Sequence, residues 1–180
     1  MNKLFPSQQP NEKIMLVVRE HWFLLAVKFA LITVFILAPV IIGIIMAYVN
    51  FSIESETFNI ILSVGLQIYY LVLVLAAFIL WVLYYLNVHI VTDQRIVDID
   101  QVGLLFREVS ELNIETIEDV TSQNVGVFGN VLNYGTVFIQ TAGAAQRFEF
   151  HNVPNPGQIA SLILQLYEAH SISDKEQPKP

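Results

Sequence analysis

The chain has 180 residues, of which 54% are hydrophobic and 14% are charged, and its formal net charge is −7. This composition suits a small membrane protein that carries one compact domain. The absence of cysteine excludes disulfides, thiolate metal sites and cysteine catalysis. The acidic excess lies entirely after Leu86 and argues against nucleic-acid binding, because affinity for phosphates depends on Lys and Arg.

Residues 1–23 form a polar N-terminal segment that we expect to be cytoplasmic or interfacial. Within Asn11–Phe23, four side chains share one face at helical spacing: Ile14, Val17, Val18 and His21. This spacing predicts an amphipathic helix that lies at the membrane interface. A cleaved signal peptide would have a shorter apolar core than the run that follows, so we do not expect cleavage.

Two long apolar runs follow, over residues 24–49 and 58–86. About 20 apolar residues in a helix span a bilayer core of about 30 Å, and in hydrocarbon every backbone amide must be paired within its segment. Residues 24–86 are therefore predicted to be a transmembrane helical hairpin in the lipid bilayer. Pro39 leaves the Phe35 carbonyl without its usual donor, which predicts a kink in the first helix.

Four residues are candidates for interhelical contact, namely Gly43 and Ala47 on the first helix and Ser63 and Gln67 on the second. Small residues one turn apart allow helices to approach closely, and a polar side chain in lipid needs a partner. We expect the partner of Gln67 on the first helix or on a second copy of the protein. The helices carry no charged residue beyond Lys28, which favours interhelical contact over a polar conduit.

The charges that flank the helices predict the topology. The loop between the helices, residues 50–57, has two glutamates and no Lys or Arg. Four basic residues precede or begin the first helix, and Arg95 follows the second. The positive-inside rule then predicts a multi-pass protein of the plasma membrane with both termini in the cytoplasm.

Residues 87–170 change from a helical period to a strand period. Short runs rich in β-branched residues, separated by turn-forming Gly, Asn and Asp, predict an antiparallel barrel or sandwich. The predicted strands are residues 88–92, 95–100, 104–112, 117–123, 136–141 and 147–153. The segment Gly126–Gly129 lacks the lysine of a phosphate-binding loop and is predicted to be a tight turn, with Phe128 packed inward.

One helix is predicted to close this domain. Asn155 suits its N-cap and Pro156 its first position. An apolar stripe marks the face expected to pack on the sheet: Ile159, Leu162, Ile163, Leu166 and Tyr167. Residues 171–180 are polar and are predicted to be a disordered tail.

Six short motifs occur in order within residues 87–154: Val91–Ile96, Gly103–Leu105, Ile117–Val120, Asn133–Val137, Thr141–Gly143 and Phe150–Pro154. Together with the helical hairpin before them, they resemble the bacterial pleckstrin-homology-like (PH-like) domains found on small two-helix membrane proteins. The resemblance covers residues 24–170. It implies a membrane α-helical hairpin plus a mainly-β PH-like domain, a bent antiparallel sheet or barrel capped by a C-terminal helix. It also implies a binding and positioning module rather than an enzyme.

Residues that could carry chemistry are sparse. The four histidines lack the close spacing of metal ligands, and neither a nucleophile nor a base is fixed by the sequence beside Asp98 and Asp100. We therefore expect no catalytic residue, no metal and no cofactor. Arg95 is the arginine closest in sequence to the end of the hairpin and is a candidate for contact with lipid headgroups. The alternative is that Arg95 pairs with a local carboxylate.

The leading hypothesis is a non-enzymatic, membrane-anchored PH-like module that binds or organises proteins at the cytoplasmic face. The expected partners are the bilayer and a protein, or a second copy bound through the helices, with no nucleic acid. Two alternatives stay open, a subunit of a membrane transport or envelope-stress system that acts through its helices, and a lipid-sensing domain. The acidic charge of residues 87–180 argues against the last, because anionic headgroups attract Lys and Arg.

Overall fold

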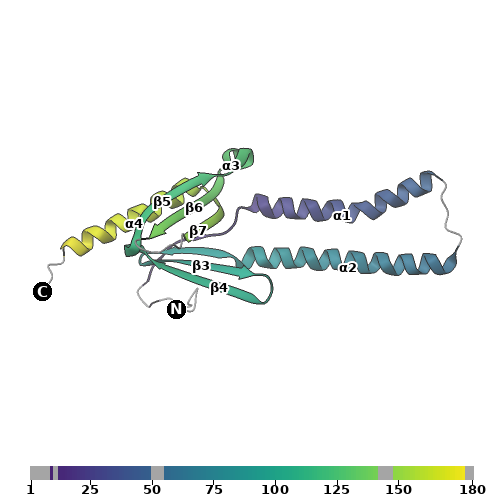
Figure 1. Cartoon of the computed structure of the whole chain (residues 1–180), viewed down its shortest axis with the longest axis horizontal. Coiled ribbons are helices and arrows are strands. Elements are labelled where there is room, and N and C mark those ends of the chain that lie inside the picture. Colours follow the sequence, from purple (N-terminus) through teal and green to yellow (C-terminus); the bar gives the residue numbers. More distant parts are fainter. Residues whose placement is uncertain (1–8, 10–11, 50–54, 142–147, 177–180) are drawn as a thin grey trace. The chain divides into compact units, whose positions relative to one another are not determined.

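The structure is a computed structural model that describes residues 9, 12–49, 55–141 and 148–176 (Figure 1). The chain forms two compact units. One unit combines Met1–His21 with Tyr85–Pro180, and the other is Trp22–Tyr84. Residues from both ends of the chain therefore build the domain, and the segment between them is the helical hairpin.

The hairpin consists of α1 (Trp22–Tyr48) and α2 (Glu56–Leu86), each starting two residues earlier than predicted. Both helices are long and apolar enough to cross a membrane, with mean hydropathies of 2.9 and 2.4 over an 18-residue stretch of each. Apart from the buried Ile32, the described side chains of these helices are exposed or only partly buried, so their apolar surface suits hydrocarbon rather than water. The prediction of two helices that can cross a membrane is confirmed.

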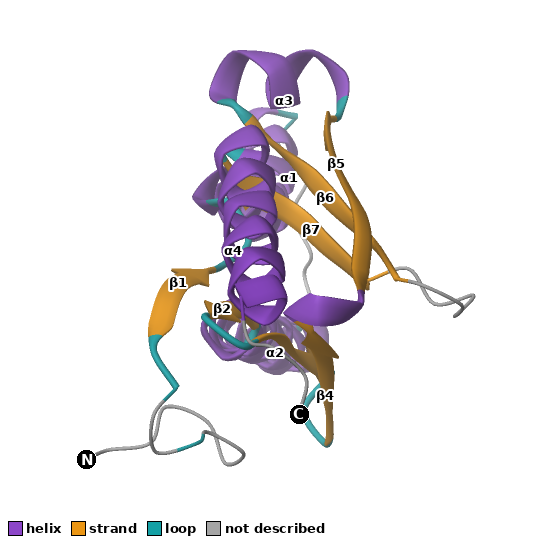
Figure 2. Ribbon diagram, turned by 90° about the vertical axis from the view of Figure 1, so that its left-hand side faces the viewer, coloured by secondary structure: helices purple, strands orange, loops and turns teal. Residues whose placement is uncertain are grey.

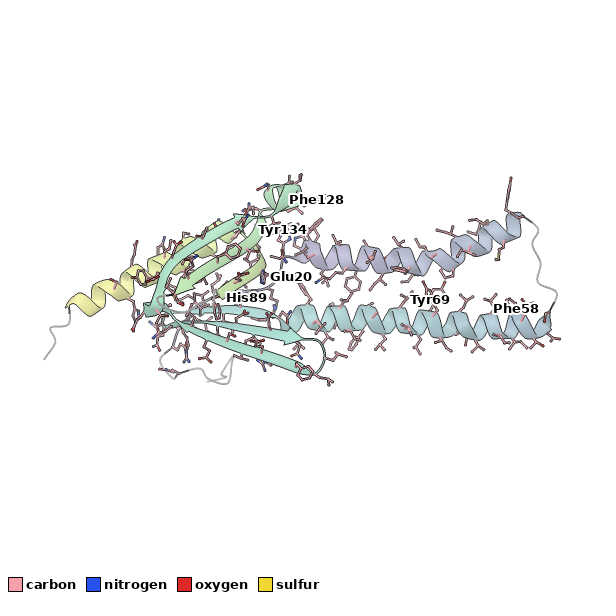
Figure 3. All side chains as sticks on the ribbon, in the orientation of Figure 1. Glu20, Phe58, Tyr69, His89, Phe128 and Tyr134 are labelled. Atoms are coloured by element: carbon pink, nitrogen blue, oxygen red, sulfur yellow. The ribbon has the colours of Figure 1, made fainter. Side chains whose placement is uncertain are left out.

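Tyrosine hydroxyls on α2 compensate for the proline in α1. The helix contains Pro39, and Figure 1 shows that α1 bends along its length. The hydroxyl of Tyr69, labelled in Figure 3, donates a hydrogen bond of 2.8 Å to the Phe35 carbonyl that Pro39 deprives of its donor. The hydroxyl of Tyr70 donates to the Ile36 carbonyl at 3.3 Å. Because hydrocarbon offers no other donor, these bonds join α1 to α2.

The first sheet of the domain has four antiparallel strands. They are β1 (Ile14–Val18), β2 (Val88–Thr92), β3 (Arg95–Val102) and β4 (Phe106–Asn113), in the order β1-β2-β3-β4. The last three lie at or close to the predicted ranges. A tight turn joins β2 to β3, so each strand runs back along its neighbour.

The prediction of an interfacial helix over Asn11–Phe23 is wrong, because Ile14–Val18 pairs with β2 as a strand. Leu16 and Val18 contact the hydrophobic core, while the residues on either side of Leu16 are exposed. This alternation also fits a strand. The edge of β2 supplies the backbone partners that turn a short ambiguous run into β1.

The second sheet has three antiparallel strands, β5 (Ile117–Asn124), β6 (Tyr134–Thr141) and β7 (Phe148–Pro154), in that order. A short 3-10 helix, η1 (Ile114–Thr116), leads from β4 into β5. The two sheets do not close into a barrel. The fold is the open form of the predicted PH-like arrangement.

Gly126–Leu132 forms the short helix α3, where a tight turn was predicted. The predicted inward packing of Phe128 is wrong, because this side chain is 62% exposed. Gly129 lets α3 fold closely onto the start of β6, since a Cβ atom there would lie 2.9 Å from the Tyr134 carbonyl oxygen. Asn133 ends α3 in the left-handed conformation, with φ of 52°.

α4 (Pro156–Glu176) starts at Pro156 as predicted and lies along the three-stranded sheet (Figure 2). Its Ile159, Ala160 and Ile163 side chains are buried, whereas Leu162 is only half-buried. The three buried residues belong to a core whose further members come from both sheets and include Val91, Ile96, Val137, Ile139, Phe150 and Val153. The predicted stripe is confirmed, with its centre at Ile159 and Ile163 rather than at Leu162.

The C-terminal boundary of α4 differs from the prediction. The helix continues to Glu176, so the disorder predicted for residues 171–176 is wrong. Residues 177–180 of the predicted tail lie outside the described residues. The side chain of Asn155 does not cap α4, because its Oδ1 accepts a hydrogen bond of 2.7 Å from Asn133 Nδ2.

Candidate functional site

A buried carboxylate ties the N-terminal segment to the first sheet. Glu12 has no exposed side-chain surface. Its carboxylate accepts hydrogen bonds from Arg95 Nε and Nη2 at 2.9 and 3.0 Å, from the Thr92 hydroxyl at 2.8 Å and from the Gln9 backbone N–H at 2.9 Å. Arg95 also donates to Glu111 on β4 at 2.6 Å. We call Glu12, Thr92, Arg95 and Glu111 the β1 clasp.

The clasp is an ion pair at neutral pH. Burial raises the pKa of Glu12, but the hydrogen bonds from Arg95, Gln9 and Thr92 and the positive charge of Arg95 outweigh it, so this pKa lies below its ordinary value. The hydrogen bond to Glu12 raises the pKa of Arg95 by more than burial lowers it, and Glu111 adds to the rise. Each charge therefore stabilises the other in a place where neither is well hydrated.

A cavity of about 310 Å³ borders the clasp and is lined by Gln9, Gln94, Arg95, Glu111 and Asn113. The guanidinium of Arg95 is shared between two carboxylates and offers no net positive charge to an anionic ligand. Arg95 therefore pairs with carboxylates, as in the second of the two alternatives, although Glu12 is distant from it in the sequence. Contact between Arg95 and a lipid headgroup stays a prediction, and these two ion pairs disfavour it.

A second polar cluster surrounds His89 on β2 (Figure 3). Its Nδ1 lies 2.6 Å from the Asp98 carboxylate on β3, and its ring stacks on Phe150 with centroids 4.5 Å apart. Burial raises the pKa of the neighbouring Asp100, and the charge of Asp98 adds to the rise, while His89 and His151 oppose it. Asp100 therefore binds a proton more readily than an ordinary aspartate does.

The geometry of this cluster does not match a hydrolase triad. Across the three strands the order of opposed residues is His89, Asp98 and Ser110. The carboxylate therefore lies between the imidazole and the hydroxyl, whereas a triad requires the imidazole in the middle. Within the described residues, no three His, Cys, Asp or Glu side chains are grouped so that they could hold a metal ion.

The structure does not bring the four predicted interhelical residues together. Among the described residues, nothing lies within 4 Å of a Cβ placed at Gly43, and Ala47 is exposed. The Ser63 hydroxyl donates to the Ile60 carbonyl of its own helix at 3.0 Å. Gln67 is exposed, and its side chain has no hydrogen-bond partner in the described part of the chain. Helix contact through these four residues stays a prediction. Since the described chain does not supply it, the partner would be another copy or another protein.

Sequence reasoning missed Tyr69 and Tyr70, whose hydroxyls donate hydrogen bonds from α2 to α1. A signal for them was present. Both hydroxyls lie in the middle of an apolar run, where each needs an acceptor, and Pro39 on the other helix frees a carbonyl. The Tyr69 hydroxyl in one apolar run and the Phe35 carbonyl freed by Pro39 in the other together predict a hydrogen bond between the two helices.

Sequence reasoning also missed that β4 is an edge strand. Six of its eight residues are exposed and none is buried. Its side chains include Arg107, Glu108 and Glu111, charges of both signs. The outer edge of β4 is not paired with another strand in the described structure, and such an edge can accept an extended segment of another chain.

The comparison with known families covers most of the chain. A model of the family described as Bacterial PH domain matches residues 21–167, which include both long helices and β2 to β7. The match begins at His21 and leaves out β1 and Glu12. No curated protein matches the chain. Two apolar helices, antiparallel sheets and a closing C-terminal helix agree with this match, and the chain belongs to the bacterial PH domain family.

Proposed function

We propose that this protein is a non-enzymatic, membrane-anchored PH-like module that binds another protein at the cytoplasmic face of the plasma membrane. The observation that carries the proposal is the open edge of β4. A row of backbone donors and acceptors on an exposed strand is a binding site for an extended peptide, and the side chains along it select the partner. The non-catalytic role rests on the family, whose PH-like folds act as positioning modules.

A protein fits this domain better than an anionic lipid headgroup does. Residues 87–180 carry five basic and twelve acidic side chains, so anionic headgroups repel the domain. Arg95 is shared between Glu12 and Glu111. On β4, in contrast, Arg107 and Glu108 are exposed on opposite faces of the strand. Such a mixed edge favours a partner segment that also carries both charges.

The cytoplasmic placement rests on charge. The inter-helix loop and the start of α2 contain Glu54 and Glu56 and no Lys or Arg, whereas basic residues flank the other ends of both helices. The positive-inside rule places the basic flanks in the cytoplasm. Because β2 begins directly after α2, the domain would lie on that same side.

The test places a photo-crosslinking residue at Val109, which is 44% exposed on β4, in the full chain in its native membrane. Position Glu168, exposed on α4, is the matched control. We expect a protein adduct at position 109 and not at position 168. Equal labelling at both positions, or adducts with lipid alone at position 109, would contradict the proposal.

Self-association through α2 is the second part of the proposal. A carboxamide in hydrocarbon needs both a donor and an acceptor, and Gln67 finds neither within the described chain. Two copies related by a two-fold axis can satisfy both groups, because each Gln67 donates to the other. In vesicles, energy transfer between labelled copies should fall in Gln67→Leu and persist in Val72→Leu, a change on another face of α2. Equal transfer in both variants would contradict a Gln67 pair.

A further inference from the structure

Two tips of the domain expose large apolar side chains. The turn between β3 and β4 carries Leu104 and Leu105, and β4 begins with Phe106; these three residues are 59%, 87% and 72% exposed. The short helix α3 carries Val127, Phe128 and Val131, which are 77%, 62% and 74% exposed. We call these the hairpin tip and the α3 tip. Turns of a water-soluble domain usually carry Gly, Pro, Asn, Asp or Ser, so paired apolar tips indicate a contact surface.

The hairpin tip lies at the place where the chain leaves the membrane helix α2. Only Asn87 separates α2 from β2, and its side-chain oxygen accepts a hydrogen bond of 2.8 Å from the Gln101 backbone N–H on β3. The start of β2 pairs with β3 at Ile99, so β3 runs on past that point for three residues, about 10 Å, before the turn. The hairpin tip therefore projects beyond the start of β2, the strand with which the chain enters the domain after α2.

The α3 tip lies at the place where the chain enters α1. Tyr134, the first residue of β6, stacks on His21 with ring centroids 5.1 Å apart, and His21 directly precedes α1. Because Gly129 has no Cβ atom, α3 lies close to the backbone of Tyr134. Figure 3 shows Phe128, Tyr134 and Glu20 at the same end of the domain. The α3 tip therefore lies close to the residues that lead into α1. In the same way, the hairpin tip lies close to the start of β2, where the chain leaves α2.

The entry and the exit are themselves neighbours. The guanidinium of Arg19, which precedes α1, lies 5.6 Å from the ring centroid of Tyr85 near the end of α2. Arg and Tyr are the side chains that anchor proteins at the boundary between headgroups and acyl chains. One end of the domain thus carries the two chain crossings and both apolar tips.

The two tips contain no charged residue, although the domain as a whole is acidic. Residues 103–106 and 125–134 have no Asp, Glu, Lys or Arg. Arg107 is exposed at the base of the hairpin tip, and a long basic side chain can keep its charge in the headgroup region while its stem lies on apolar surface. An apolar surface without charge fits the boundary region of a bilayer, where binding depends on buried apolar area.

We propose that the hairpin tip and the α3 tip insert into the interfacial region of the leaflet from which the domain emerges. This contact is separate from protein binding at β4. It would determine how the domain is oriented on the bilayer. It does not depend on anionic lipid, since the inserted residues are uncharged. We propose a lipid surface as the partner of the two tips, because the points where the chain enters α1 and leaves α2 lie at the same end of the domain.

The test uses the full chain in nanodiscs of phosphatidylcholine without anionic lipid. The absence of native cysteine allows single fluorescent probes at Leu105→Cys and Val127→Cys, with Glu118→Cys as the control. Glu118 is exposed at the end of β5 opposite to α3. When acyl chains are brominated, we expect both tip probes to lose most of their fluorescence and the Glu118 probe to lose none. Tip probes that behave like the Glu118 probe would overturn the proposal.

A second variant tests insertion of the hairpin tip independently, in case the probe at Leu105→Cys changes the structure of that tip. With the probe at Leu104→Cys, adding Leu105→Asp should expel the hairpin tip and remove the quenching by brominated lipid. Persistent quenching in this variant would contradict insertion of the hairpin tip. Tip probes shielded in native membranes but exposed to water in nanodiscs would also overturn the proposal, because a protein would then be the partner.

Discussion

We expect the β1 clasp to contribute strongly to the stability with which β1 is held on the domain. The Glu12 carboxylate is fully buried and accepts four hydrogen bonds, two of them from Arg95. Glu12→Ala removes all four acceptor contacts, and removing one partner of a buried ion pair costs about 3–5 kcal/mol. Arg95 keeps Glu111 and is 16% exposed, so the lower end of the range, about 3 kcal/mol, applies to the release of β1 from β2.

The assay is backbone hydrogen exchange of Ile14–Val18 in the full chain in nanodiscs. Where exchange follows the opening equilibrium, about 3 kcal/mol makes exchange roughly a hundredfold faster, at about 1.4 kcal/mol for each factor of ten. Glu118→Ala removes an exposed carboxylate from β5 and should leave the exchange of β1 unchanged. Unchanged protection of β1 in Glu12→Ala would refute the reasoning, because the clasp would then not hold the strand.

The pH dependence of the same assay follows from the lowered pKa of Glu12. A carboxylate whose folded pKa lies below its unfolded pKa contributes stability above the unfolded pKa, about 4.3 for Glu, and loses it as the pH falls through the folded value. Protection of β1 should therefore fall in acid in the wild-type chain. In Glu12→Ala this part of the acid response should be absent, and an identical response in both chains would contradict the assignment.

Three further predictions follow from the structure. Tyr69→Phe removes the donor to the Phe35 carbonyl and should weaken the hairpin by about 1 kcal/mol, seen as a lower unfolding midpoint in a detergent titration; an unchanged midpoint would count against this bond. In intact cells, a thiol at Ser55 should react with an impermeant reagent and one at Glu168 should not, whereas the reverse pattern would invert the topology. Burial and Asp98 raise the pKa of Asp100, so the stability that it contributes is present below its unfolded pKa and is lost as the pH rises through its folded pKa. Asp100→Asn should accordingly raise the melting temperature at neutral pH but not in acid, and equal melting temperatures at neutral pH would exclude a cost of ionisation.

The sequence by itself determined the features whose physics is local. The two helices that can cross a membrane follow from length and hydropathy alone, because in hydrocarbon the backbone must bond within its own segment. The strands from Val88 to Pro154 follow from alternation and from turn residues between them. The start of α4 at Pro156 follows from the fixed φ of proline, which suits a first helical turn.

Only the tertiary structure decided the features that depend on distant partners. Ile14–Val18 fits either a helix or a strand by its own pattern, and the free edge of β2 made it a strand. Glu12 meets Arg95 across 83 positions, a pairing that no local spacing records. In the same way, the outward position of Phe128 depends on how α3 folds onto β6. Local patterns specify which surface a segment must bury, but the partner that buries it is selected only when the whole chain packs.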